Sequence, residues 1–186
     1  RSAEYETRSP GRQIYNGRFD HGSFAGIANG WQIEGTGFCT DAALIPTVKV
    51  EPGTHAQAVF ARGDLGHEHI ASTLSTAVIA EPGKPVKIAL SWAGNDAKTL
   101  ADISARIGIE PTGGTDLESS KIRWTEWKNL KRSWEERSAE AVADNSLVRL
   151  FVQARSKGAL KGGTAVFMLR DVNVASAQPA SSAPAR

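Results

Sequence analysis

Hydrophobic and polar residues alternate with a period close to two along most of the chain. Side chains of a β-strand point alternately to its two faces, so this period predicts strands with one buried face. The segment "VKIALSWAG" places four apolar side chains on one such face: Val86, Ile88, Leu90 and Trp92. The segment "ADISARIGIE" repeats the pattern with Ile103, Ala105, Ile107 and Ile109. The alternation therefore predicts a fold built mainly of strands.

Two further segments continue this alternation. In "HAQAVFAR" the residues of one face are Ala56, Ala58 and Phe60. In "SLVRLFVQAR" one face carries Val148, Leu150, Val152 and Ala154. Leu147 and Phe151 fall on the opposite face of that segment, so both of its faces are expected to be partly covered.

Short turns rich in proline and glycine separate the predicted strands. The tripeptide "EPG" occurs at 51–53 and again at 81–83, and "WAGND", "PTGG" and "LKGGT" follow further along the chain. Proline followed by glycine suits a tight chain reversal. The spacing of these turns predicts roughly nine or ten strands in an all-β fold, a jelly-roll β-sandwich of two antiparallel sheets.

The segment "SWEERSAEAVADN" carries two competing signals. It contains good helix formers, and Ser133 with Glu136 matches a helix capping box. Its apolar residues form no helical stripe, however, because Ala139, Ala141 and Ala143 alternate with other residues. The alternation favours a strand here.

The two ends of the chain differ from its middle in composition. The last twelve residues, 175–186, are almost all alanine, serine and proline, which is typical of a linker. The 186-residue chain lacks an initiator methionine and an apolar signal segment, so it reads as a piece of something longer. We therefore expect a leader at 1–12, one β-sandwich domain at 13–174 and a linker or tail at 175–186.

Charge and cysteine content restrict the possible partners. The net charge is +2 and the basic residues are spread along the chain, which does not indicate nucleic-acid binding. No apolar run approaches the roughly 20 residues needed to cross a bilayer. Cys39 is the only cysteine and cannot form an internal disulfide, so it is expected to be a small buried hydrophobe or a free thiol.

The sequence gives little support to an enzyme. "GIEPTGGTD" lacks the lysine and the serine or threonine that end a nucleotide-binding loop, and no nucleophile turn with a glycine on each side of a serine occurs. His67 and His69 could face one side of a strand, but the spacing suggests no third metal ligand. A pair of catalytic carboxylates cannot be recognised from sequence alone.

Several motifs, taken in order, resemble a known family. They are "NGRFDHG", "GWQIEG", "EPGTHAQAVF", "EPGKPVKIALSWAG" and "AVFMLRDVNV". This order resembles galactose-binding-like jelly-roll carbohydrate-binding modules, and "IGIEPTGGTD" followed by "IRWTEW" is similar to a secreted bacterial branch of these sandwiches. The likeness implies a sandwich whose first and last strands are adjacent, in an extracellular or cell-surface protein.

The same resemblance implies a structural calcium ion near the junction of the first and last strands. Asp20 and Asp171 match ligand positions of such a site, with loop carbonyls completing the oxygen set. Arg170 stands where many relatives carry another acid, and an arginine repels a divalent cation. An ion pair of Asp171 with Arg170 or Arg18 is the alternative.

The five tryptophans are the natural candidates for stacking against sugar rings. Trp92 shares its face with apolar residues, and Trp31 resembles the core tryptophan of the family, so both are expected in the core. Trp124 and Trp127 lie three residues apart, so on a regular strand they point to opposite faces unless a bulge intervenes. At least one of them is therefore expected outside the core or at its rim, either stacking on a ligand or covering a loop.

These observations lead to a predicted binding site and to two functions. The predicted ligand-binding residues are Trp124, Trp127, Arg106, Glu110, Asp116, Arg123 and Glu126. The favoured function is non-catalytic binding of a polysaccharide or glycoconjugate by a secreted or surface module. The alternative is a structural or adhesive module that packs against neighbouring domains or subunits, which would bury the outer tryptophan against another chain.

Overall fold

The described part of the molecule is built from strands. The computed structural model describes residues 13–20, 22–36, 38–41, 55–62, 66, 69–94, 103–156 and 164–175. These residues form thirteen strands and no helix; nine of the strands have four or more residues and the other four have two. The all-β prediction is confirmed.

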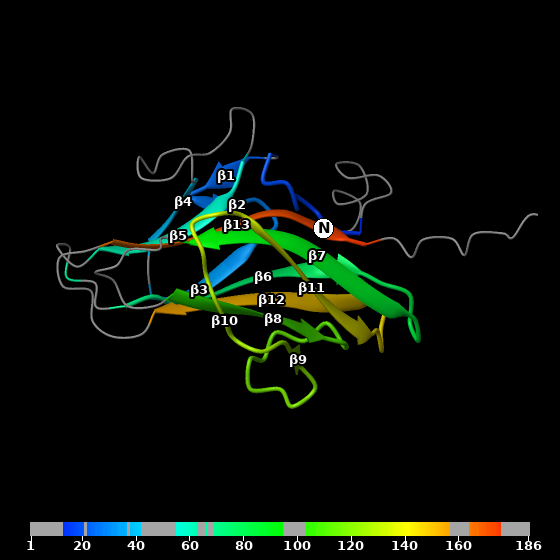
Figure 1. Ribbon diagram of the computed structural model, residues 1–186. Coiled ribbons are helices and arrows are strands. Elements are labelled where there is room, and N and C mark those ends of the chain that lie inside the picture. The colour runs from blue at the N-terminus through cyan, green and yellow to red at the C-terminus, as the bar shows by residue number, and fades with distance from the viewer. Residues whose placement is uncertain are drawn as a thin grey trace, which may run out of the picture.

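One layer of the sandwich is a six-stranded antiparallel sheet, the lower layer in Figure 1. Its order is β10-β8-β12-β6-β3, and the short β9 also pairs with β8. The strands are β3 (Gln32–Thr36), β6 (Ala71–Ile79), β8 (Ile103–Glu110), β9 (Arg123–Trp124), β10 (Lys128–Asn129) and β12 (Leu147–Ser156).

The other layer is a five-stranded antiparallel sheet with the order β11-β7-β13-β5-β4. Its strands are β4 (Phe38–Asp41), β5 (Gln57–Arg62), β7 (Pro85–Gly94), β11 (Glu135–Val142) and β13 (Thr164–Val174). A separate small hairpin joins β1 (Ser23–Phe24) to β2 (Ile27–Ala28). Because neighbours in each sheet are mostly distant in sequence, the topology is that of a jelly roll.

The core lies between the two sheets and consists of the predicted apolar faces. The four apolar residues predicted on one face of β7 and the four predicted on one face of β8 are all at most 4% exposed. Trp92 packs edge-on against Phe167 with ring centroids 6.4 Å apart, and Trp31 is 5% exposed. Both tryptophans are thus core residues, as predicted.

The segment with competing helix and strand signals is strand β11. It pairs with β7 along its full length, from Glu135 opposite Trp92 to Val142 opposite Pro85. Ala139 is buried on the inner face, and Ala143 is buried just beyond the strand. The alternation of small apolar residues was therefore the correct signal, because burial against β7 and the core outweighs helix propensity.

The first described residues connect the two sheets. Ile14 forms an isolated bridge with Val78 of β6, and the backbone N–H of Val172 in β13 donates to the carbonyl of Gly17 at 2.8 Å. The beginning of the domain therefore lies beside its last strand, as the resemblance implies. The predicted leader, and the predicted tail beyond Ala175, lie outside the described residues.

Candidate functional site

The outer face of the six-stranded sheet brings together side chains from strands far apart in sequence. The register aligns them in rows that run across the strands. One row contains Gly108, Phe151, Ser75 and Gln32, and the next contains Arg106, Gln153, Thr73 and Glu34. These rows are mainly polar, with an aromatic group near the β8 edge.

A β-bulge puts both outer tryptophans on this face. Trp124 pairs with Gly108 and Lys128 pairs with Ala105, so the edge segment advances by one residue more than β8 does. The backbone N–H of Thr125 donates to the carbonyl of Ile107, and the hydroxyl of Thr125 accepts the backbone N–H of Ile107. The regular-strand expectation of opposite faces is therefore wrong, and the bulge alternative holds.

Trp124 lies flat on the sheet because β8 has a glycine beneath it. A Cβ atom added to Gly108 would be 2.5 Å from Cε3 of Trp124. Phe151 of β12 lies beside the indole with ring centroids 6.1 Å apart, and the guanidinium of Arg106 lies 4.0 Å from the ring centroid of Trp124. The indole is consequently held in one position and remains partly exposed.

Hydrogen bonds orient the polar side chains around the indoles. The Nε of Arg106 donates to Oε1 of Gln153 at 2.8 Å, and Nε2 of Gln153 donates to the hydroxyl of Thr73 at 3.2 Å. The guanidiniums of Arg106 and Arg155 lie 4.6 Å and 3.8 Å from the ring centroid of Trp127. We call the group of Trp124, Trp127, Phe151, Arg106, Gln153 and Arg155 the tryptophan platform.

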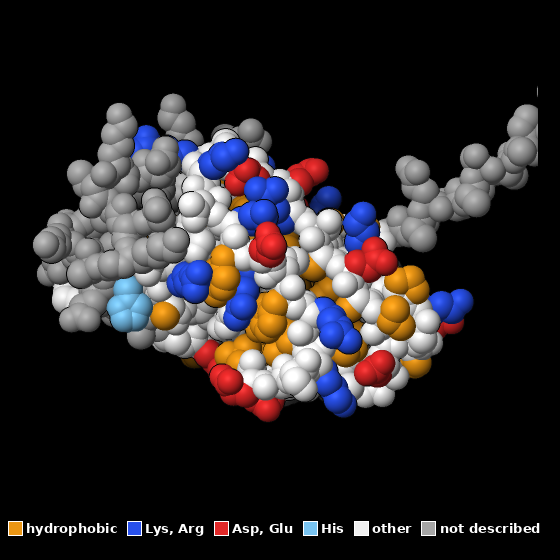
Figure 2. Space-filling view, turned by 60° about the horizontal axis from the view of Figure 1, so that its bottom comes forward, with side chains coloured by type: hydrophobic (Ala, Val, Ile, Leu, Met, Phe, Trp, Pro, Cys, Tyr) orange, Lys and Arg blue, Asp and Glu red, His pale blue; other side chains and the backbone are white. Residues whose placement is uncertain are grey.

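The platform is electrostatically positive at its arginines. Burial lowers the pKa of Arg106, and the nearby positive charge of Arg155 lowers it further. Burial also lowers the pKa of Arg149, which lies on the same face of β12. Figure 2 turns the lower sheet of Figure 1 toward the viewer and shows hydrophobic and basic side chains intermixed there.

Of the seven predicted site residues, Arg106 lies with both tryptophans and the other four do not. Arg123 precedes Trp124 on its short strand, so its side chain leaves the strand on the opposite side. Glu126 is exposed and forms an ion pair of 3.7 Å with Lys128. Asp116 is exposed in the loop after β8, where its Oδ1 accepts the N–H of Glu118 at 3.0 Å.

Glu110 has a structural environment rather than a solvent-facing one. It is 1% exposed, and its carboxylate accepts the backbone N–H of Thr112 at 3.0 Å, that of Gly114 at 2.6 Å, and the hydroxyl of Thr112. The carboxylate thus fixes the "PTGG" turn. We assign Glu110 to that turn and not to ligand contact.

Replacing Glu110 with alanine should destabilise the domain. The change leaves the N–H groups of Thr112 and Gly114 without their acceptor, which should lower the free energy of unfolding by about 2–3 kcal/mol in urea titrations. Asp116→Ala is the control, since this exposed carboxylate accepts one hydrogen bond in the same loop. An equal, small effect of the two substitutions would contradict the role given to Glu110.

Sequence reasoning missed Phe151, Gln153 and Arg155 as members of the site. The sequence did show that these three residues share one face of β12, because alternate residues of a strand point to the same side, here the side opposite the core. The missing information was the register between β12 and β8, which places Gln153 opposite Arg106. No local signal in the sequence specifies that pairing.

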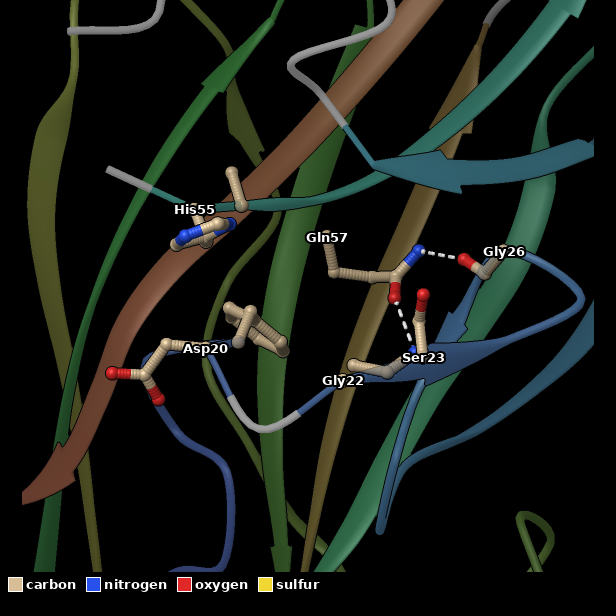
Figure 3. Close-up of a pocket in the computed structure, with 9 residues that line it drawn as sticks. Asp20, Gly22, Ser23, Gly26, His55 and Gln57 are labelled. Atoms are coloured by element: carbon tan, nitrogen blue, oxygen red, sulfur yellow. Dashed lines mark hydrogen bonds between the residues drawn. The ribbon is translucent and has the colours of Figure 1, made fainter. Parts of the chain in front are cut away.

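A second feature is a cavity of about 250 Å³ beside the β1–β2 hairpin. Figure 3 shows Asp20 and His55 on one side of it and Gln57 on the other. The amide of Gln57 accepts the N–H of Ala28 at 2.8 Å and donates to the carbonyl of Gly26 at 2.9 Å. The cavity is therefore closed on that side by a hydrogen-bonded hairpin.

The two predicted calcium ligands line different cavities. Asp20 lines the cavity near His55, whereas Asp171 lines another, together with Arg18. Asp171 also forms an ion pair with Arg170, with Nε and Oδ2 3.5 Å apart, which is the alternative predicted from sequence. The assignment of Asp20 and Asp171 as calcium ligands, and calcium binding itself, therefore stay predictions of the resemblance.

Two of the four histidines lie in the described part of the chain. His55 and His69 are exposed, while His21 and His67 lie outside the described residues. Within the described ranges no three metal-ligating side chains gather. Cys39 belongs to β4, and the expectation for its side chain stays a prediction.

Comparison with known proteins gives a result at the level of structure. Neither a family model nor a curated protein matches the sequence. The TmCBM61 module, solved with β-1,4-galactotriose, is similar with a TM-score of 0.59 and 13% identity, covering 88% of this chain and 97% of that one. The chain has the fold of carbohydrate-binding β-sandwich modules.

Two further structures share this fold. The C-terminal family 22 carbohydrate-binding module of Clostridium thermocellum Xyn10B has a TM-score of 0.53 and 12% identity, covering 91% of this chain and 98% of that one. The enzymatically active domain of bacteriophage CBA120 tailspike protein 4 has a TM-score of 0.51 and 13% identity, covering 88% of this chain and 21% of that one. The fold therefore also occurs inside a catalytic protein, and function has to be argued from the site.

In the part of the chain that the structure describes, no helix has the length and apolarity needed to cross a bilayer.

Proposed function

We propose that this domain is a non-catalytic module that binds a polysaccharide or glycoconjugate on the tryptophan platform. The observation that carries the proposal is the bulge, which brings Trp124 and Trp127 to one outer face beside Arg106. The fold shared with modules such as TmCBM61, whose structure holds a galactotriose, supports the same assignment.

The platform has the chemistry that sugar recognition needs. Indole rings pack against the apolar C–H faces of pyranose rings, while planar polar groups exchange hydrogen bonds with the hydroxyls. Gln153 and Arg106 are already fixed by their mutual hydrogen bond and by Thr73. Binding therefore immobilises few side chains, and such preorganisation lowers the entropic cost of association.

The proposal involves binding without turnover, in a secreted or cell-surface protein. Glycoside hydrolysis uses two carboxylates that flank the scissile bond. In the segments that form the platform, the acids are Glu110, whose oxygens accept hydrogen bonds from its own turn, and Glu126, which pairs with Lys128. This engagement favours recognition over bond cleavage.

The test is a glycan array with the isolated domain and with single tryptophan variants. Trp124→Ala and Trp127→Ala should each weaken binding to the preferred glycan by about 30-fold or more, as expected for aromatic residues at the centre of an interface. Trp134→Ala is the matched control, because this indole packs on the other sheet near Ala93 and Met168. Trp134→Ala should leave glycan affinity unchanged.

A structural or adhesive module is the competing function, and the same experiment separates the two. If no glycan binds and the wild-type domain self-associates or captures a neighbouring module through Trp124 and Trp127, the proposed function is wrong. Loss of glycan binding only in the two platform variants would support it.

A further inference from the structure

Three arginines lie on the outer face of β8 and β12, beside the indoles. They are Arg106, Arg149 and Arg155, and in the described part of the chain none of them forms an ion pair. The Nε of Arg149 is buried and has no hydrogen-bond partner among the described residues. A positive group held in this way gains free energy when an anion approaches.

In the described part of the chain, the acids on this face form no ion pair with the arginines. Glu110 lies opposite Arg149 in the register, but its carboxylate accepts the hydrogen bonds of the "PTGG" turn, and Glu126 pairs with Lys128. Glu34 is exposed on β3, which is separated from β12 by β6. The unpaired positive charge is thus concentrated on β8 and β12, beside the indoles.

Two of the arginines are oriented with their guanidinium ends free to donate. The Nε of Arg106 is engaged by Gln153 and the Nε of Arg155 by the hydroxyl of Ser104 at 3.3 Å. No hydrogen bond among the described residues uses their Nη groups, which are not among the buried unpaired atoms. A guanidinium presents paired donors that match the two oxygens of a carboxylate.

We propose that the polysaccharide bound by the platform carries carboxylate groups, as hexuronic acid residues do, and that Arg106 and Arg155 pair with them. The inference rests on the proposed function and specifies its ligand class. Arg149 and Arg155 stand at either end of the exposed face of β12, separated by roughly 20 Å of extended chain. This span suits several sugar units, with indoles between the charged contacts.

The mutual repulsion of the platform arginines supports this ligand class. The pKa of Arg106 is lowered by burial and then by the charge of Arg155, so the two positive groups destabilise each other in the unbound domain. A carboxylate bound between them removes that repulsion. A neutral sugar leaves the repulsion in place.

The test compares acidic polysaccharides with their own carboxyl-reduced forms in native affinity gels. The probes are polygalacturonate, alginate and glucuronoxylan. At least one acidic polymer should bind about tenfold more tightly than its reduced form, and the ratio should shrink when NaCl rises from about 0.05 M to about 0.5 M. Arg155→Gln should bind the acidic and the reduced polymer equally. Arg132→Gln, at an exposed arginine between β10 and β11, should keep the preference for the acidic polymer.

Each outcome has a definite meaning, provided that thermal melts show both variants folded. Equal binding of acidic and reduced polymers, or binding of neutral polymers alone, overturns the inference and leaves the proposed function standing. Failure of every polymer, acidic and reduced, overturns the inference, and the glycan array then decides the proposed function separately. If dextran sulfate or an oligothymidylate binds as tightly as the best acidic polysaccharide, or more tightly, the platform is a general polyanion site and the inference is also overturned.

Discussion

Replacing Gly108 with alanine should weaken glycan binding about as strongly as removing Trp124 itself. The added methyl group would lie 2.5 Å and 2.6 Å from two ring atoms of Trp124 and 2.9 Å from Cγ2 of Ile122. Contacts this short force the ring to move, and the sheet beneath it cannot yield, because Gly108 lies in β8 between the core residues Ile107 and Ile109. The indole then tilts away from the position in which it lies beside Phe151 and Arg106.

The size of this effect can be measured separately for stability and for binding. Overpacking of this kind should lower the free energy of unfolding by about 1–3 kcal/mol. Calorimetric titration with the preferred glycan should show an affinity loss comparable to that of Trp124→Ala, and the tryptophan fluorescence should shift.

A double-mutant cycle identifies the cause of the Gly108→Ala effect. In a Trp124→Ala background, most of the stability cost of Gly108→Ala should disappear, because the main clash is with the missing ring. Gly108→Ala with wild-type affinity would falsify the assignment of Trp124 as a stacking surface.

The layers of the fold could be predicted from the sequence because burial acts locally along each strand. The period of two in β7 and β8 selected the core residues correctly, since each strand has one face against the opposite sheet. In β11 the same period was a better guide than the capping-box pattern of Ser133 and Glu136. Alternation is informative wherever one face of a strand is buried along its whole length.

The composition of the platform could not be predicted because it depends on pairing between distant strands. Arg106 and Gln153 are 47 residues apart in the sequence, yet their hydrogen bond orients the centre of the face. A shift of β12 by one residue would turn Gln153 into the core and expose Val152 and Ala154. Burial of these two apolar residues therefore fixes Gln153 on the outer face. That constraint becomes visible only when the partner strand is known.

The bulge and the turn acid show two further limits of sequence reasoning. The spacing of Trp124 and Trp127 allowed either opposite faces or one face, and Thr125 decides between them by bonding to Ile107 with both its backbone and its hydroxyl. Glu110 fell on the predicted outer face of its strand, but two backbone N–H groups of the following turn capture its carboxylate. In both places a hydrogen bond that residue spacing does not specify decides the role of a side chain.

Gly17→Ala should cause the largest loss of stability of the substitutions considered, without changing glycan affinity in the molecules that stay folded. A Cβ atom at Gly17 would lie 2.0 Å from the carbonyl oxygen of Val172, and the backbone N–H of Val172 donates to the carbonyl of Gly17 at 2.8 Å. Neither backbone can move without breaking this contact between the first residues of the domain and β13. The expected loss is about 3 kcal/mol of unfolding free energy in urea titrations.

Gly83→Ala is the matched control for Gly17→Ala, because it introduces the same methyl group without a clash. Gly83 has φ of 78° and no atom within 4 Å of an added Cβ, so only the left-handed backbone is penalised, by about 1 kcal/mol. Because Gly17 contacts β13 and the platform lies on the other sheet, Gly17→Ala should lower stability and leave the dissociation constant unchanged. Equal stability losses in the two variants would show that the contact with Val172 does not hold the N-terminal segment in place. A weakened affinity in folded Gly17→Ala would instead mean that the affinity of the platform depends on the packing of the opposite sheet, because the added methyl group contacts β13 and not the sheet that carries the platform.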